Sequence, residues 1–210
     1  MSQDPIAFLT ETYPSLFAEG VALLEASAAT DAKAKAQLDD IRAAAGGAHV
    51  VLEGEGGGDV WLVVKDGVMR AERKAPEGVK VSMAFAVPAS AAAAGLALLE
   101  EEGTLGLDDA KRRIAGVASK KLETLLAPEK ITFHVTVKDV PDLETVTAKI
   151  ALGLADPPEK PGFTATLSWD SLEDLKNGDL TPQQLFFNKT KIVGDATRAM
   201  TLAMSAMPRK

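Results

Sequence analysis

Residues 60–72 read VWLVVKDGVMRAE, two apolar runs that are joined by Asp66-Gly67. An Asp-Gly pair between apolar runs is a strong short-range signal of a β-hairpin, because both residues tolerate the positive φ angles of a tight turn. A short apolar run at 49–52 precedes this stretch, and alternating apolar residues at 79–85 follow it. Alternation with a period of two is typical of a strand with one buried face. We therefore expect four consecutive strands with antiparallel connections in this part of the chain.

Helical patterns flank these strands on both sides. A helix is expected from Pro14 to about Ala28, since proline is favoured in the first turn of a helix and the apolar residues that follow share one face. A second helix, capped by Thr30, is expected to end at the glycine pair 46–47, because glycine commonly terminates helices. From 88 to 127 the apolar spacing is again helical.

The last third of the chain repeats this succession. Strands are predicted at 131–137, 146–154 and 163–169, and a further strand at 191–193 lies between short helices and a C-terminal helix. The order αα-ββββ-αα-βββ-αα-β-α indicates an α+β fold, with mostly antiparallel sheet(s) and helices packed on one side.

The recurrence also predicts the domain organisation. We expect an N-terminal helical segment at 1–30, followed by two related but diverged halves at 31–127 and 128–210. An approximate two-fold axis is expected to relate the halves.

The composition excludes several classes of function. The 210 residues carry 23 Lys and Arg against 30 Asp and Glu, a net charge of −7, and include no cysteine. An acidic chain is unsuited to binding nucleic acids, or to holding to an anionic membrane by charge alone. The missing cysteines exclude a thiol nucleophile, a thiolate metal site and disulfide bonds. Because the sequence has neither a run of about 18 apolar residues nor a signal-peptide pattern, we expect a soluble, cytoplasmic protein.

The motif search finds no catalytic constellation. His49 and His134 lack a partner at the spacing of a metal site or a catalytic base, and are expected to be hydrogen-bonded residues at sheet edges. The glycine run 54–58 lacks the Gly-Lys-Ser/Thr ending of a phosphate loop and is interpreted as a flexible hairpin turn. No Gly-x-Ser-x-Gly nucleophile motif occurs. No catalytic residue, metal or cofactor is predicted.

The C-terminal region contains two patterns that bear on function, a capping box and an apolar helix face. Thr181-Pro182-Gln183-Gln184 has the residues of a capping box at a helix start. The last helix is expected to present one face made of Ala196, Ala199, Met200, Ala203, Met204 and Met207. Alanines leave room and methionines fill irregular volume, which suits the lining of an adaptable apolar pocket. The same pattern is also typical of ordinary core packing, and both interpretations stay open.

Residues 168–187, SWDSLEDLKNGDLTPQQLFF, resemble the end of the sterol carrier protein type-2 domain. In that family a strand leads to a leucine-containing helix and then to a leucine-x-proline-glutamine helix with phenylalanine. The run 191–195, KIVGD, followed by Ala199 and Met200, is similar to the family's last strand, turn and closing helix. The match is close over this C-terminal stretch and looser over 128–208.

The resemblance implies an α+β fold that encloses an apolar tunnel for a fatty acid, a fatty acyl-CoA, a phospholipid or a sterol, without a covalent step. Two features depart from the family. Residues 188–191, NKTK, have Thr190 where an apolar residue is usual, and the chain ends in Pro208-Arg209-Lys210 rather than in the peroxisomal Ser-Lys-Leu.

Our leading hypothesis is a non-enzymatic lipid-binding or lipid-transfer protein that holds an apolar ligand in an internal tunnel. Its expected partner is a lipid or acyl-chain ligand, with transient membrane contact during transfer and no nucleic acid. The alternative is an accessory protein-interaction module with a collapsed cavity. An enzyme that acts on a small molecule is disfavoured, because no catalytic motif was found.

We predict that the terminal helix at 195–207 gates the tunnel, because a terminal element has few chain connections to break. Its three methionines are expected to face the ligand. The predicted ligand-binding residues are Leu167, Trp169, Leu172, Leu175, Leu185, Phe186, Phe187, Ile192, Met200, Ala203, Met204 and Met207.

Overall fold

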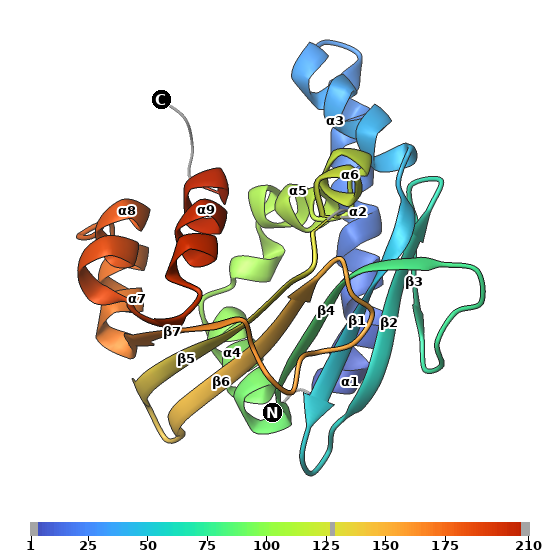
Figure 1. Cartoon of the computed structure of the whole chain (residues 1–210). Helices are drawn as coiled ribbons and strands as arrows, with labels where there is room; N and C mark the ends of the chain where they lie inside the picture. The colour runs from blue at the N-terminus through green and yellow to red at the C-terminus, as the bar shows by residue number, and fades with distance from the viewer. Residues whose placement is uncertain (1–3, 127–128, 207–210) are drawn as a thin grey trace.

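The computed structural model describes residues 4–126 and 129–206. Within them, eight strands form one mixed sheet in the order β3-β2-β1-β4-β6-β5-β7-β8 (Figure 1). The strands are β1 (Ala45–Glu53), β2 (Gly58–Lys65), β3 (Val68–Glu72), β4 (Lys80–Pro88), β5 (Ile131–Val140), β6 (Glu144–Leu152), β7 (Phe163–Ser168) and β8 (Lys191–Gly194). The helices are α1 (Pro5–Ala7), α2 (Tyr13–Ala28), α3 (Ala32–Arg42), α4 (Ala89–Glu101), α5 (Asp108–Gly116), α6 (Lys120–Leu126), α7 (Trp169–Asn177), α8 (Pro182–Gln184) and α9 (Ala196–Ala206). Short π-helical turns, Phe8–Thr12 and Leu185–Lys189, continue α1 and α8, and a 3-10 turn occupies Thr104–Gly106.

The predicted fold class is confirmed. In the described chain, five neighbouring strand pairs are antiparallel, whereas β1–β4 and β5–β7 are parallel. Asp66 and Gly67 have φ angles of 53° and 75° in the two-residue turn between β2 and β3, as a tight hairpin turn requires. The glycine run 54–58 joins β1 to β2, so it is a hairpin connection as predicted.

Several element boundaries differ from the expectation, three of them in what begins or ends a helix. Helix α3 ends at Arg42, and the glycine pair 46–47 lies inside β1, where a side chain on Gly46 would meet the Glu123 carboxylate at 2.7 Å. Asp31 rather than Thr30 caps α3, because its side chain accepts a hydrogen bond from the Lys33 amide. Trp169 begins α7 instead of ending a strand.

The strand pairing repeats along the sheet. β1 is antiparallel to β2 and parallel to β4, and β5 is antiparallel to β6 and parallel to β7. Two sets of three adjacent strands, β2-β1-β4 and β6-β5-β7, therefore follow one another across the sheet. The strands β1 and β5 run in the same direction. A translation along the sheet therefore relates the two sets. The expected two-fold axis is wrong, since it would reverse the order of the second set.

One face of the sheet is apolar across both sets. The register places Val50 beside Phe85, Phe85 beside Ile150, and Ile150 beside Phe133. One core, around Phe17, lies between this face and α2, α3 and α5, and a second lies between it and α9. Figure 1 shows α2, α4 and α5 behind the sheet. The predicted packing of helices on one side is thus observed.

The opposite face is more polar, and the loop at 153–162 crosses it. The ring of His49 stacks on Trp61 at 4.3 Å between centroids, with Nδ1 2.9 Å from the carbonyl oxygen of Ala155 and Nε2 2.9 Å from Oδ1 of Asp59. His134 Nε2 lies 3.0 Å from the Pro158 carbonyl oxygen. Both histidines therefore contact carbonyl oxygens of this loop. They lie in the interior strands β1 and β5, so their predicted place at sheet edges is wrong.

Gly20 allows α2 and α5 to lie in backbone contact. A side-chain carbon at this position would lie 2.1 Å from the Lys111 carbonyl oxygen, which would force the helices apart. We expect Gly20→Ala to lower the free energy of unfolding by about 1–3 kcal/mol, as overpacking does, although alanine is intrinsically the better helix former by about 1 kcal/mol. Urea denaturation measures this change.

The matched control is Gly95→Ala in α4. Apart from its chain neighbours and the backbone of its own helix, no described atom lies within 4 Å of the added carbon. This variant should therefore gain up to about 1 kcal/mol from helix propensity. Stabilisation by both substitutions would contradict the close contact between α2 and α5.

Candidate functional site

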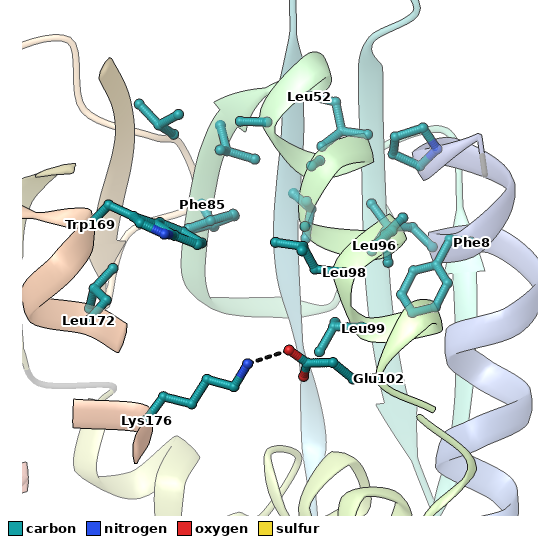
Figure 2. A pocket seen from close by; sticks show the side chains of 18 of the residues that line it. Phe8, Leu52, Phe85, Leu96, Leu98, Leu99, Glu102, Trp169, Leu172 and Lys176 are labelled. Carbon is teal, nitrogen blue, oxygen red and sulfur yellow. Dashed lines mark hydrogen bonds and ion pairs between the residues drawn. The ribbon is translucent and has the colours of Figure 1, made fainter. Parts of the chain in front are cut away.

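An apolar groove lies between the core around Phe17 and the core under α9, beside a smaller cluster of Phe8, Leu16 and Leu96. Its floor is the apolar face of β1, β4 and β6, and its volume is about 730 Å³. Helices α4 and α7 form two walls, and the N-terminal turns at 5–9 close a third side (Figure 2). The described lining residues are Pro5, Phe8, Leu9, Val50, Leu52, Phe85, Val87, Ala91, Ala92, Gly95, Leu96, Leu98, Leu99, Glu102, Val146, Trp169, Leu172, Glu173 and Lys176.

Side-chain size explains why the groove is not filled. Helix α4 turns Ala91, Ala92 and Gly95 toward it, and these residues have little or no side chain to place there. Below them, Leu98 and Leu99 keep 43% and 36% of their surface exposed. Large apolar side chains that remain accessible around a cavity are typical of a ligand-binding surface.

Helix α7 supplies the opposite wall. Trp169, Leu172 and Lys176 follow one another at i, i+3 and i+7, so they share one face of the helix. Ser168 caps this helix by accepting a hydrogen bond from the Ser171 amide, and Gly178 ends it with a φ of 84°. Figure 2 shows Trp169 and Leu172 on one side of the groove and Phe8 and Leu96 on the other.

An ion pair spans the mouth of the groove. Lys176 Nζ donates a hydrogen bond to Glu102, at the C-terminal end of α4 (Figure 2). This hydrogen bond is the main reason that the pKa of Glu102 lies below its usual value. Because both side chains are substantially exposed, we expect the pair to hold the mouth only weakly.

Two further hollows continue the groove along the apolar face. One, of about 310 Å³, lies under α6 and shares Leu9, Val50 and Phe85 with the groove. The other, of about 410 Å³, lies over β5 and β7 and shares Leu172 with it. Three apolar hollows that share lining residues therefore follow one another along this face of the described chain.

The structure brings together six of the predicted ligand-binding residues. Trp169 lines the groove, and Leu172 lines both the groove and the hollow over β5 and β7. That hollow also contains Leu167, Leu185, Phe186 and Ala203. The predicted capping box of α8 is present: the Gln184 amide donates to Thr181 Oγ1, and the Thr181 amide donates to Gln184 Oε1. Thr190, the departure from the family pattern, also lines the hollow and donates to the Leu185 carbonyl oxygen at 3.0 Å.

The other predicted residues lie elsewhere. Ile192 packs in the core with Phe163, and the half-buried Leu175 lines none of the three hollows. Phe187 is 53% exposed. Met207 is outside the described residues.

The orientation of α9 differs from the expected face. Ala199 is buried and Leu202 packs against the same core, whereas Met200 and Met204 are 40% and 62% exposed. Ala203, and neither of these methionines, is among the described residues that line the hollow over β5 and β7, so we now expect Ala203 to be the residue of this helix nearest a ligand.

Sequence reasoning missed the contribution of the first part of the chain. It placed the site in the last forty residues, whereas β1, β4 and α4 form most of the groove. A signal was present in residues 89–99, ASAAAAGLALL, which are apolar on nearly every side. A helix of that kind is typically enclosed by other elements rather than exposed on one face.

Residues 4–126 and 129–206 hold neither a candidate metal site nor a candidate membrane span. No group of three or more His, Cys, Asp or Glu side chains there is placed to hold a metal ion. No helix in these ranges has the length and apolar character that crossing a membrane requires.

Comparison with known proteins returned one structural similarity to describe. No protein-family model matches the chain, and no curated protein matches it. The chain is similar to the solution structure of the sterol carrier protein domain 2 of Helicoverpa armigera, with 26% sequence identity over 42% of this chain and 80% of that one. The TM-score is 0.29.

The position of α9 generates a direct test. Ala203 lines the hollow over β5 and β7, and its neighbour Met204 is mostly exposed. We expect Ala203→Trp to fill this hollow and to weaken binding of an apolar fluorescent probe by about tenfold, equivalent to about 1.4 kcal/mol. Met204→Trp should change binding little, although it adds the same indole ring. A larger loss for Met204→Trp than for Ala203→Trp would contradict the orientation of α9.

Proposed function

We propose that this protein binds an apolar ligand non-enzymatically and carries it in the groove between α4 and α7. The observation that supports this proposal most is the groove itself. It has a volume of about 730 Å³, within the usual range for ligand pockets, and its described lining is apolar apart from Glu102, Glu173 and Lys176. The two hollows that adjoin it extend the same apolar surface.

A lipid fits this lining better than a polar metabolite does. Each methylene group moved from water into an apolar site contributes about 0.8 kcal/mol, so a long chain needs few polar contacts to bind. Part of this gain is offset by the ordering of the chain and of the side chains that meet it. A polar ligand would instead leave its hydrogen-bonding groups without partners on this floor.

The chemistry of the lining favours a carrier over an enzyme. Among the described residues around the groove, neither a histidine nor a serine is present to act as a base or nucleophile. Two of the three ionisable groups, Glu102 and Lys176, pair with each other across the groove (Figure 2). The C-terminal stretch that resembles the sterol carrier family supplies Trp169 and Leu172 to this groove, which also supports a lipid ligand.

Gly95 offers a way to block the groove. It lies on the groove side of α4, and a side chain there would meet open space. We expect Gly95→Leu to leave the fold intact and to weaken binding of N-phenyl-1-naphthylamine, an uncharged apolar probe, by at least tenfold (about 1.4 kcal/mol). Fluorescence titration measures the affinity, and circular dichroism verifies the fold.

Ala94→Leu is the matched control. The neighbouring residue is also exposed, but it does not line the groove. This variant should bind the probe like the unmodified protein. Equal binding by all three proteins would place the probe outside the groove and would contradict the proposed site.

Native mass spectrometry of the purified protein separates a carrier from an accessory interaction module. A bound lipid that is lost in Gly95→Leu would support the carrier. Failure of the probe and of fatty acids, acyl-CoAs and sterols to bind saturably would contradict it, and would favour the module with a collapsed cavity.

A further inference from the structure

The charges at the mouth of the groove are unequal. Two carboxylates, those of Glu102 and Glu173, line the groove with a single ammonium group, that of Lys176. Lys176 already pairs with Glu102 across the mouth, and its hydrogen bond lowers the pKa of Glu102, so this carboxylate is charged at neutral pH. Glu173 makes no ion pair with any described residue.

The helix positions keep Glu173 near the polar end of a ligand. Glu173 and Lys176 are three residues apart on α7, so they project from neighbouring points of one helix face. Leu172, the residue before Glu173, lies on the apolar wall. Because Glu173 also lines the groove, a polar end group that lies at this part of α7 would meet its carboxylate.

These charges discriminate between polar end groups. A carboxylate at the mouth would find the Lys176 ammonium engaged by Glu102 and would be repelled by Glu173. An amine would find in Glu173 a carboxylate that has no other partner among the described residues. The net charge of −7 on the whole chain acts in the same direction.

We propose that the groove prefers a long-chain ligand with a cationic amine at its polar end over the corresponding fatty-acid carboxylate, with the uncharged alcohol between them. This inference rests on the proposed function, because it assumes that an apolar chain occupies the groove. The interacting charges are exposed, so the preference is modest and salt weakens it.

The test uses three ligands with one chain. Dodecylamine, dodecan-1-ol and dodecanoate displace N-phenyl-1-naphthylamine from the protein at about pH 8, where ordinary amines and carboxylic acids are both charged. At about 0.01 M salt we expect dodecylamine to displace the probe at a concentration at least about threefold lower than dodecanoate does. The difference should shrink at about 1 M salt, where the Debye length falls to roughly 3 Å.

Glu173→Gln identifies the group responsible. This variant should lose most of the difference between amine and carboxylate while it still binds the alcohol. Glu77→Gln is the control, since it changes the net charge equally in the connection between β3 and β4 and lines none of the three hollows. An unchanged preference in Glu173→Gln would overturn the role of Glu173.

The remaining outcomes separate this inference from the proposed function. Equal displacement by the three ligands, or tighter binding of dodecanoate, would overturn the preference and leave the apolar groove in place. Failure of the probe and of all three ligands to bind would overturn both.

Discussion

The pairing of β4 with β6 is the constraint on which the groove depends. It joins two sets of strands into one sheet and places Phe85 beside Ile150, so that a single apolar face continues from β2 to β7. A shift of one residue in this pairing would turn the side chains of one set to the opposite face. The floor takes Phe85 and Val87 from β4 and Val146 from β6, and so it exists only where the two sets meet.

Packing on either side of this junction leaves the middle open. Phe17 and Ile41 belong to the core beneath α2 and α3. On the other side, Phe163 of β7 and Ala199 of α9 belong to one core. Between them α4 offers alanine and glycine to the sheet, which cannot reach across the remaining distance. The short side chains of Ala91, Ala92 and Gly95 therefore account for part of the open volume beside α4.

Local signals predicted most of the elements but not their assembly. The turn at Asp66-Gly67 and the capping box at 181–184 were predicted correctly, because their geometry depends on neighbouring residues. The two-fold axis was predicted wrongly, because the order of strands depends on pairing between distant segments. For the same reason α7 was found as part of the site and α4 was not: their proximity follows from the β4–β6 junction, which no local pattern encodes.

Occupancy of the groove and stability of the fold are linked. Leu98 and Leu99 expose apolar surface, and each square ångström that a ligand covered would contribute about 25 cal/mol. A ligand that binds the folded chain and not the unfolded one stabilises the fold as its concentration rises above its dissociation constant. Release must then reverse the same apolar burial, which favours transfer to another apolar environment over escape into water. The exposed ion pair of Glu102 and Lys176 adds little to this barrier, so the rate of release depends mainly on how much of the chain the groove covers.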